Sequence, residues 1–590
     1  MWLPALLYVL ALGLRLTWIG LVPSKPVGDF AMYLESATYL LEHGRFDPQF
    51  IYMPGYVLLA AGVQALGGTW WATKVAGALL AAAGAPLVFG MARRLWGGRA
   101  ATVAGLLYAL WPGGIGVASV TGTDIPAAVL VAAAAWALLQ ARPDTPWRAA
   151  LVAGTFFGLA AWIRAVALPL APLSVFFLRA RTGSWRRATA GAACTTLAAA
   201  LVLAPWGFRN HARYGAWFLT DSHGGLTALV GAYPNSDGQF TRALNRMVET
   251  VTGTPWLGEP HREADARAYE EAKRWTRFEP RYALGLAIQR ADKLLSNERS
   301  LLYWPLYRDG VLREPAAGFF ERWRPEIERA TDLFWWALLA SCLAGTVLGA
   351  LERRPETLGL LPFQLALAGV YVLFFAESRY HLPIAVLAFP NAAGCAVRAW
   401  DAVRLRRVPP LPDAPAPAPA PAKALWNLAA ALIATALVLA LSWVTVSWGD
   451  SLRARHRFAV HACEVKGLWH YCLWRSADPG RSGRPSPVKG VFDGVGLSLG
   501  PEETGAETLL ALGPGSHRLH AQLTAIAPGQ TGGEASLLLD GRERARVPLS
   551  RLHGGLGLTL SFETQGAVRL AIRGTAPQEG QVWLEGLRVE

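Results

Sequence analysis

A short acidic stretch, Val27-Gly28-Asp29-Phe30-Ala31-Met32-Tyr33, follows the first apolar run of this chain, residues 1–22. That run is long enough to span a bilayer, which takes about 20 apolar residues. Asp29 is therefore expected at the boundary between membrane and water. Most other apolar runs avoid Asp and Glu, because a charge inside lipid is costly. Asp29, together with Asp124 between two later runs, is thus the first candidate for catalysis.

The composition indicates a polytopic α-helical membrane protein. Of 590 residues, 53% are hydrophobic and only 17% are charged, which is too apolar for an ordinary soluble enzyme. Hydropathy and charge together predict about eleven transmembrane helices. We expect them at residues 1–22, 71–92, 100–120, 125–141, 149–163, 165–179, 187–206, 331–351, 357–375, 382–398 and 424–447.

The net charge of +14 reflects membrane topology and not a nucleic-acid partner. Many basic residues lie in short loops between apolar runs, as the positive-inside rule predicts, and no separate basic stripe with aromatic residues is present. These loops carry Arg93, Arg94, Arg99, Arg142, Arg148, Arg179, Arg181, Arg186, Arg187, Arg353, Arg354, Arg398, Arg404, Arg406, Arg407 and Lys423. The N-terminus is then cytoplasmic, and Asp29, Asp124 and residues 377–381 share the outer face of the cytoplasmic membrane.

The chain divides by composition into a helical part and a tail. Residues 1–400 hold ten of the predicted helices and two outer loops, 23–70 and 207–330. In the first loop, residues 52–68 predict an interfacial helix. In the second, residues 263–297 show helical spacing broken at Pro280. Residues 401–423 form a cytoplasmic linker rich in Ala and Pro, which favours an extended chain, and 424–447 form the last span.

The tail, residues 455–590, predicts an extracytoplasmic β-sandwich. Short apolar or alternating runs at 535–539, 556–560 and 568–572 read as strands between Gly- and Pro-rich turns. Asp540-Gly541 predicts a tight hairpin turn. Cys463 and Cys472 are nine positions apart, and a disulfide between them is expected if the tail lies outside the cytoplasm.

Five motifs in chain order resemble the GT-C class of integral-membrane glycosyltransferases. They are Gly28-Asp29 with Tyr33, Ala37, Gly44 and Met53-Pro54-Gly55-Tyr56; Thr121-Gly122-Thr123-Asp124-Ile125-Pro126; Trp162-Ile163-Arg164; Pro205-Trp206-Gly207-Phe208-Arg209-Asn210 with Tyr214-Gly215, Gly224-Gly225 and Gly231; and Glu377-Ser378-Arg379-Tyr380-His381-Leu382-Pro383. The resemblance covers roughly residues 1–400. Protein O-mannosyltransferases and bacterial lipid A aminoarabinose transferases are relatives in this class.

The resemblance implies a GT-C-like fold and a polyprenyl-phosphate-linked sugar as donor. In such enzymes the loop acid after the first helix is the proposed catalytic base, a position that Asp29 takes here. Many relatives carry a second acid directly after it, where this chain has Phe30, and an Asn where it has Ala232. The resemblance also implies transfer with inversion. The acceptor could be a protein, a lipid or a glycan, and the sequence does not name the sugar.

The residue types in these motifs suit glycosyl transfer. A carboxylate can accept the proton of an attacking hydroxyl, which makes Asp29 the expected base. Asp124 is the second catalytic candidate and would orient the acceptor or the arginines. Arginine binds phosphate through two parallel hydrogen bonds. We therefore expect Arg164, Arg209 and Arg379 on the donor phosphate. The remaining substrate-binding candidates are Tyr33, Asn210, Glu377, Tyr380 and His381.

Structural roles compete with each assignment. Asp29 and Asp124 could cap helices, Arg164 could snorkel from a helix end, and His381 could simply bond a backbone carbonyl. A divalent metal held by Asp29, Asp124 and His381 remains an alternative, although no ligand spacing supports it.

Three other functions compete with sugar transfer. A transporter or flippase of lipid-linked sugars should show an internal repeat and polar residues at the bilayer midplane, and neither is evident. An oligosaccharyltransferase should carry a Trp-Trp-Asp signature, whereas both Trp-Trp pairs, 70–71 and 335–336, precede Ala. A carbohydrate-binding protein would not need eleven helices as its anchor.

Overall fold

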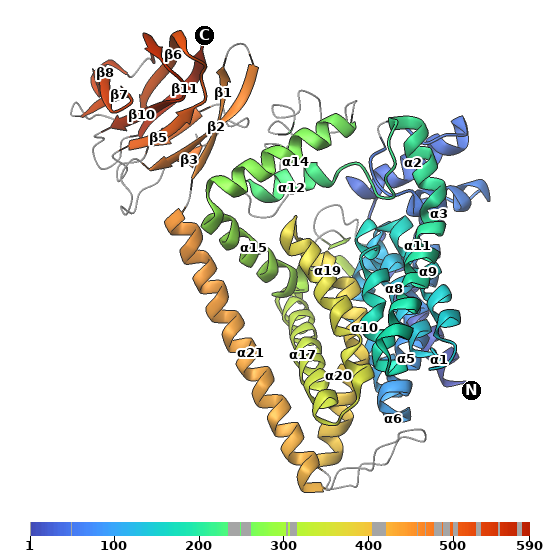
Figure 1. Cartoon of the computed structure of the whole chain (residues 1–590). Helices are drawn as coiled ribbons and strands as arrows, with labels where there is room; N and C mark the ends of the chain where they lie inside the picture. The colour runs from blue at the N-terminus through green and yellow to red at the C-terminus, as the bar shows by residue number, and fades with distance from the viewer. Residues whose placement is uncertain are drawn as a thin grey trace. The chain divides into compact units, whose positions relative to one another are not determined.

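The computed structural model contains a helical part and a β-sheet part (Figure 1). It describes residues 2–48, 50–233, 248, 261–302, 305–306, 316–403, 421–456, 458–465, 468–476, 486–487, 496–499, 505–526, 533–552, 555–574 and 581–590. The chain separates into two compact units. Unit 1 comprises residues 1–221 and 290–444, and unit 2 comprises residues 222–289 and 445–590.

Unit 1 is built from helices that follow the apolar runs of the sequence. Its helices are α1 (Leu3–Leu21), α2 (Asp29–His43), α3 (Gly55–Ala65), α4 (Trp70–Ala82), α5 (Gly84–Trp96), α6 (Gly98–Ala109), α7 (Pro112–Gly116), η1 (Val117–Ser119), α8 (Asp124–Leu139), α9 (Pro146–Ile163), η2 (Ala165–Ala167), α10 (Leu170–Thr182), α11 (Trp185–Tyr214), η3 (Arg299–Leu302), α16 (Ala316–Arg322), α17 (Arg324–Leu351), α18 (Pro355–Leu358), α19 (Leu361–Leu373), η5 (Ser378–His381) and α20 (Leu382–Val403). Helices α15 (Pro280–Leu295) and α21 (Pro421–His456) contain the boundaries between the units.

Unit 1 is a multi-pass membrane region. Within the described residues, eight helices are long and apolar enough to cross a membrane, or up to nine if the bent pair of α6 with α7 and η1 is one span. The two other predicted spans correspond to α8, which has 16 residues, and α9. Each of the eleven predicted ranges is therefore helical, and the number of crossings remains a prediction. The predicted interfacial segment contains α3.

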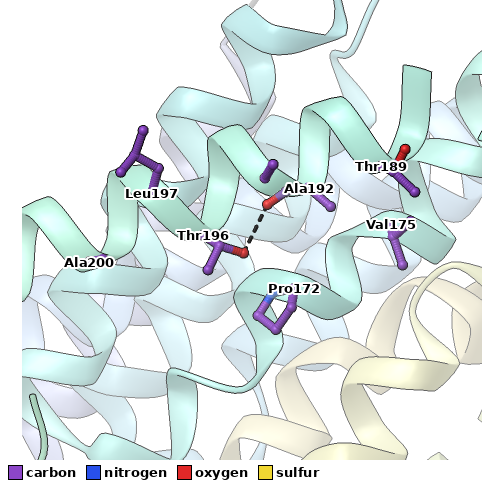
Figure 2. A pocket seen from close by; sticks show the side chains of 8 residues that line it. Pro172, Val175, Thr189, Ala192, Thr196, Leu197 and Ala200 are labelled. Carbon is purple, nitrogen blue, oxygen red and sulfur yellow. Dashed lines mark hydrogen bonds between the residues drawn. The ribbon is translucent and has the colours of Figure 1, made fainter. Parts of the chain in front are cut away.

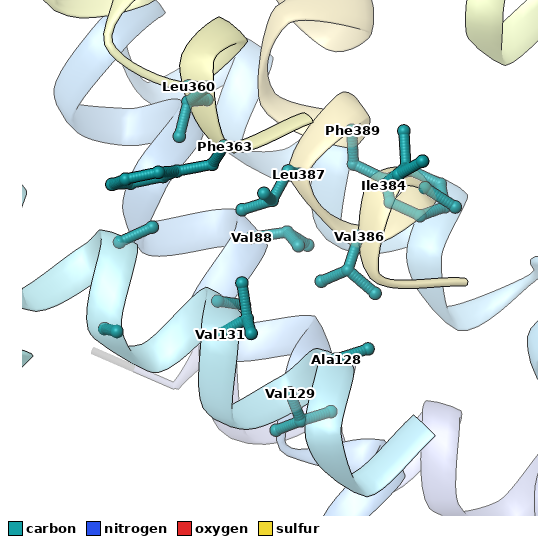
Figure 3. Packing of buried hydrophobic residues seen from close by; sticks show 14 of the residues in the cluster. Val88, Ala128, Val129, Val131, Leu360, Phe363, Ile384, Val386, Leu387 and Phe389 are labelled. Atoms are coloured by element: carbon teal, nitrogen blue, oxygen red, sulfur yellow. The ribbon is translucent and has the colours of Figure 1, made fainter. Parts of the chain in front are cut away.

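Small residues let these helices approach closely. A Cβ on Gly158 of α9 would lie 2.7 Å from the Cβ of Val202 on α11. A Cβ on Gly345 of α17 would clash with the backbone of Asn391 on α20. Close approach of this kind drives helix association in lipid, where apolar burial gives no net gain. The core of unit 1 contains buried side chains of α5, α8, α19 and α20, among them Val88, Val131, Phe363 and Leu387 (Figure 3).

An apolar groove lies between α10 and α11. It has a volume of about 630 Å³ and is lined by Pro172, Val175, Thr189, Ala192, Ala193, Thr196, Leu197 and Ala200 (Figure 2). Its one internal hydrogen bond drawn in the figure runs from Thr196 Oγ1 to the carbonyl of Ala192, 2.9 Å away. The lining contains none of the residues that the sequence proposes for catalysis.

Unit 2 contains helices from residues 222–289, the end of α21 and the tail. Its helices are α12 (Gly224–Ala232), α14 (His261–Phe278) and the first part of α15, with the predicted break before Pro280. The Asp265 side chain accepts hydrogen bonds from the Gly225 and Leu226 amides at 2.7 and 3.0 Å, which stabilises the start of α12. The ring of Phe458 lies 5.4 Å from those of Phe278 and Tyr282.

The tail forms the predicted β domain. Its strands are β1 (Ala459–Val465), β2 (Leu468–Ser476), β3 (Ser486–Pro487), β4 (Gly496–Leu499), β5 (Gly505–Leu510), β6 (Gly515–Ile526), β7 (Glu534–Leu539), β8 (Arg542–Pro548), β9 (Leu556–Thr564), β10 (Val568–Gly574) and β11 (Gln581–Val589). One group of strands contains β5, β7, β8 and β10, and the other contains β1, β4, β6, β9 and β11, with β2 pairing into both. Buried side chains of both groups share one core, as in a sandwich.

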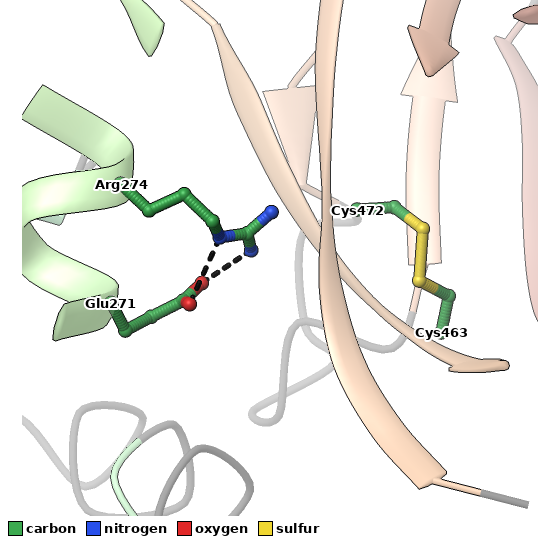
Figure 4. The surroundings of a disulfide bond; sticks show 4 residues. All are labelled: Glu271, Arg274, Cys463 and Cys472. Carbon is green, nitrogen blue, oxygen red and sulfur yellow. Dashed lines mark hydrogen bonds and ion pairs between the residues drawn. A yellow bond between two sulfur atoms is a disulfide. The ribbon is translucent and has the colours of Figure 1, made fainter. Parts of the chain in front are cut away.

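Two local predictions for the tail are confirmed. Asp540 and Gly541 have φ of 48° and 77° and connect β7 to β8, as a two-residue hairpin turn requires. Cys463 and Cys472 form a disulfide between β1 and β2 (Figure 4). Nearby in the figure, Arg274 on α14 pairs with Glu271 one turn earlier. The predicted linker falls largely on residues 404–420, which lie outside the described residues.

Candidate active site

Asp29 stands at the start of α2. The capping position before the helix belongs to Gly28, whose φ of 54° favours glycine, so Asp29 is the first residue within the helix. The partial positive charge of the helix N-terminus stabilises an ionised carboxylate there. The Asp29 side chain is 44% exposed, and its Oδ2 atom lies 3.5 Å from Nη2 of Arg379. Asp29 is thus a carboxylate that solvent and a substrate can reach.

Asp124 stands at the start of α8 and is tightly paired. Its Oδ1 atom contacts Nη1 of Arg164, which also donates a hydrogen bond to Thr123 Oγ1 at 3.2 Å. Arg164 follows the last residue of α9 in extended conformation, so its side chain leaves the helix and reaches α8. Asp124 is only 9% exposed, so its carboxylate is largely occupied by Arg164.

The third part of the site is the short helix η5 and the residue before it. Glu377 Oε2 accepts a hydrogen bond from Arg379 Nε at 2.7 Å. The Arg379 side chain is 16% exposed and lies over the rings of Phe30 and Tyr380, with its Cζ atom 5.4 and 5.3 Å from their centroids. Arg379 is therefore held between two carboxylates, those of Glu377 and Asp29.

Backbone and aromatic contacts bring these three elements together. Thr121 Oγ1 donates to the carbonyl of Phe30 at 3.0 Å, which joins the loop before α8 to α2. The Arg164 Cζ atom lies 4.6 Å from the ring centroid of Tyr380, which stacks on Tyr371 of α19 at 4.7 Å. Two arginines from different loops thus lie close to one tyrosine ring, a contact worth about 1 to 2 kcal/mol each when desolvated.

Further tyrosines extend the aromatic surface beside Asp29. The buried Tyr33 ring lies 5.9 Å from Tyr52 and 5.5 Å from Tyr56. Burial, and next the charge of Asp29, raise the pKa of Tyr33 and of Tyr52 far above the ordinary value. Both phenols therefore stay protonated and can donate hydrogen bonds at neutral pH.

The structure gathers seven of the ten candidate residues in one cluster, which we call the acid–arginine cluster. Its members are Asp29, Tyr33, Asp124, Arg164, Glu377, Arg379 and Tyr380. They come from α2, α8, the end of α9 and η5, which are far apart in the sequence. The cluster combines an accessible carboxylate with two guanidinium groups that point away from bulk solvent.

Arg209 and Asn210 belong to a different set of contacts. Arg209 lies over Trp206, with its Cζ atom 4.5 Å from the ring, and donates to Asn210 Oδ1 at 3.1 Å. Asn210 is buried and donates to the carbonyls of Phe218 and Thr220. Among the described residues, no ion pair or hydrogen bond joins either side chain to the acid–arginine cluster.

His381 is fully buried behind η5. Its Nδ1 atom lies 3.0 Å from the carbonyl oxygen of Leu294, and its Nε2 atom lies 3.4 Å from Glu298 Oε1. Its ring stacks on Trp335 with 4.0 Å between centroids. His381 therefore faces away from Asp29 and Asp124, and the three residues proposed for a divalent metal do not assemble. In the part of the chain that the structure describes, no group of three His, Cys, Asp or Glu residues could hold a metal ion.

Several residues of this region were not identified from the sequence. Tyr371 lies within an apolar run, where no motif or charged neighbour singles it out. Glu298 lies in the long outer loop, where charged residues are common. Thr121 and Thr123 belong to the second motif, so their position beside Asp124 could have indicated a role.

A comparison with family models supports this resemblance. Residues 53–208 match the family described as dolichyl-phosphate-mannose-protein mannosyltransferase. The matched region includes Asp124 and Arg164, and it confirms the resemblance to GT-C glycosyltransferases that the motifs indicate. No curated protein sequence matches the chain.

Two kinds of solved structure resemble the chain. An oligosaccharyltransferase of Archaeoglobus fulgidus in its apo form is 15% identical, with a TM-score of 0.41, over 77% of this chain and 56% of that one. ArnT of Cupriavidus metallidurans bound to undecaprenyl phosphate is 16% identical, with a TM-score of 0.38, over 76% of this chain and 75% of that one. This chain thus spans little more than half the length of the archaeal protein.

Proposed function

We propose that this chain transfers a sugar from a polyprenyl-phosphate donor to an acceptor at the outer face of the cytoplasmic membrane, with inversion at the anomeric carbon. The observation that carries the proposal is the acid–arginine cluster, in which an accessible carboxylate lies 3.5 Å from a partly buried arginine. The motifs that build the cluster, and the family match over residues 53–208, support the same class of reaction.

Asp29 acts as the general base in this proposal. The acceptor hydroxyl gives its proton to the Asp29 carboxylate while its oxygen bonds to the anomeric carbon of the donor sugar. The bond between that carbon and the phosphate oxygen breaks at the same time, and the electron pair stays on the phosphate. One displacement of this kind inverts the anomeric configuration.

Arg379 and Arg164 stabilise the departing phosphate. Negative charge grows on the polyprenyl phosphate as it leaves, and preorganised cations in a site of low dielectric lower the energy of that state. Glu377 orients Arg379 through the 2.7 Å hydrogen bond, and Asp124 orients Arg164 through its ion pair. Tyr33 and Tyr380 supply a phenol donor and an aromatic face to the sugar.

The proposal is tested by transfer assays with purified protein in lipid, using a panel of polyprenyl-phosphate sugars. Asp29→Asn is nearly isosteric and should lower turnover about 100-fold or more, because the amide cannot accept a proton. Glu35→Gln is the matched control, since Glu35 is an exposed carboxylate on the same helix and lies outside the cluster.

The outcomes separate the competing functions. Equal turnover in wild type and Asp29→Asn would exclude Asp29 as the base. Binding of polyprenyl phosphate without any transfer would instead favour a transporter of lipid-linked sugars.

A further inference from the structure

The segment that carries Glu377 and Arg379 has two faces. Glu377, Arg379 and Tyr380 belong to the acid–arginine cluster, whereas Ser378 and His381 are buried on the opposite side. Ser378 Oγ donates to the carbonyl of Lys293 at 3.2 Å. The position of Arg379 therefore depends on what holds the buried face.

Glu298 is the central contact of that face. Both its carboxylate oxygens are buried, and its Oε1 atom accepts a hydrogen bond from Trp111 Nε1 at 2.6 Å. A Cβ on Gly113 would lie 2.5 Å from the Glu298 carboxyl carbon, so glycine leaves the room that this side chain occupies. Glu298 thus connects the start of α7, the start of η3 and, through His381, the end of η5.

Two polar contacts hold the ring of His381. Its Nδ1 atom faces the Leu294 carbonyl, which only accepts, so Nδ1 carries a hydrogen. Its Nε2 atom faces Glu298 Oε1, which already accepts from Trp111. The second contact is favourable when a proton lies between Nε2 and Oε1, so the position of the His381 ring is coupled to that of the Glu298 side chain. A buried polar contact of this kind fixes geometry, because losing either member leaves a buried polar atom of the other without a partner.

Neighbouring elements hold this pair rigidly. Trp335 of α17 stacks on the His381 ring and donates from Nε1 to the Leu295 carbonyl at 2.7 Å. Asp332 Oδ1 accepts the amide hydrogens of Glu298 and Arg299, both at 2.9 Å. Helix α17 therefore fixes the backbone on which Glu298 stands.

Arg290 reinforces the same segment from its other end. Its Nε and Nη1 atoms donate to the carbonyls of Val372 and Phe374, at 2.7 and 3.3 Å, where α19 ends. These carbonyls have no partner within their own helix, so a cation there satisfies them. Burial lowers the pKa of Arg290 to about 10, which leaves it protonated at neutral pH. The chain between α19 and α20 is thus held at both ends.

We propose that Glu298 is a positioning residue for sugar transfer, which acts through His381 to fix the turn that presents Arg379 to the donor phosphate. The inference rests on the proposed function for the role of Arg379. It assigns His381 to the support of the site and not to direct contact with substrate. A shift of about 1 Å in a phosphate-binding guanidinium can lower the rate about 100-fold.

Two conservative variants test the link from its two sides. Glu298→Gln replaces the carboxyl group that faces His381 with an amide, and His381→Asn retains a donor toward Leu294 while it removes Nε2. Asn391→Ala is the matched control, because Asn391 is buried on α20 and bonds Trp96, Thr346 and the Thr357 carbonyl, away from the turn. If one of the two test variants folds poorly, the other still tests the proposal.

The first measurement is amide hydrogen exchange of residues 374–382 in the full chain in lipid, which needs no substrate. We expect exchange in this turn to become about tenfold faster in Glu298→Gln and in His381→Asn, and to stay unchanged in Asn391→Ala. The double variant should exchange no faster than the faster single variant, because in this proposal Glu298 acts on the turn only through His381. Unchanged exchange in both single variants would overturn the proposal, whatever the activity of the protein.

The second measurement is transfer from a polyprenyl-phosphate sugar. Both test variants should raise the donor KM about tenfold or more per folded molecule, whereas Asn391→Ala should leave KM unchanged. Equal changes in KM for all three variants would overturn the positioning role. If wild type itself transfers no sugar, the proposed function fails, and the exchange measurement still decides whether Glu298 positions the turn.

Discussion

Two carboxylate–arginine pairs lie in one cluster and differ in how tightly the acid is paired and how exposed it is. We call Asp124 with Arg164 the closed pair and Asp29 with Arg379 the open pair. Asp124 and Arg164 are in direct contact, and the acid is 9% exposed. Asp29 and Arg379 are 3.5 Å apart, and the acid is 44% exposed. A carboxylate that is buried against its partner is committed to holding that partner. One that is loosely paired and accessible can accept a proton from a substrate.

The difference follows from where each acid stands. Both begin a helix, so both stand at the positive end of a helix dipole. Arg164 reaches Asp124 from the end of α9 and has Thr123 as a further acceptor. Arg379 divides its contacts between Asp29 and Glu377, and the closer contact is with Glu377. Of the two carboxylates, Asp29 is therefore the one that can still accept a hydrogen bond or a proton from a substrate.

The largest effect is expected at the arginine of the open pair. Arg379→Gln removes the charge that we place on the leaving phosphate, so kcat/KM should fall about 1,000-fold. Arg379→Lys should recover only part of the loss, because an ammonium cannot donate two parallel hydrogen bonds. Steady-state transfer assays measure both variants. If both arginine substitutions left kcat/KM near that of wild type, Arg379 would have no role at the phosphate.

At the closed pair we expect a smaller effect on the rate of transfer than at Arg379, and a larger effect on stability. Asp124→Asn leaves the guanidinium of Arg164 without its charge partner in a buried site, which costs about 3 kcal/mol of unfolding free energy. Turnover should fall about tenfold, mainly through a higher donor KM, because Arg164 is misplaced. Thermal unfolding in lipid and donor titrations check this. A loss in kcat without loss of stability would instead make Asp124 a second catalytic acid.

The smallest effect is expected at the tyrosine that the two arginines share. Tyr380→Phe keeps the ring under Arg164 and Arg379 and should change kcat/KM less than about threefold, whereas Tyr380→Ala should cost about 1 kcal/mol or more. Transfer assays on the two variants separate the ring from its hydroxyl. A large loss in Tyr380→Phe would show that the hydroxyl itself binds substrate.

Much of the fold could be predicted from the sequence. Each apolar run of about 20 residues became helical because lipid allows few other backbone conformations. The strands of the tail, the turn at 540–541 and the break before Pro280 follow from short-range chemistry that is local to the sequence. The number of membrane crossings is harder to predict, since α8 has only 16 residues but is buried almost throughout.

The site could be predicted in part. Asp29, Arg164 and Arg379 were found from motifs, because those motifs resemble a known class. The side on which a residue of η5 faces depends on tertiary packing, so the sequence left open whether His381 meets phosphate or a carbonyl. Its partner Glu298 lies 83 positions away in a loop rich in charged residues. No pattern of spacing could connect the two.

The central claim is that Asp29 accepts the proton while Asp124 only holds Arg164. Its most direct test is kcat of Asp29→Asn and Asp124→Asn, side by side in lipid at saturating donor, where defects in donor binding disappear. We expect kcat to fall about 100-fold or more in Asp29→Asn and to stay within about threefold of wild type in Asp124→Asn. Equal losses in the two variants, or a greater loss in Asp124→Asn, would contradict the assignment.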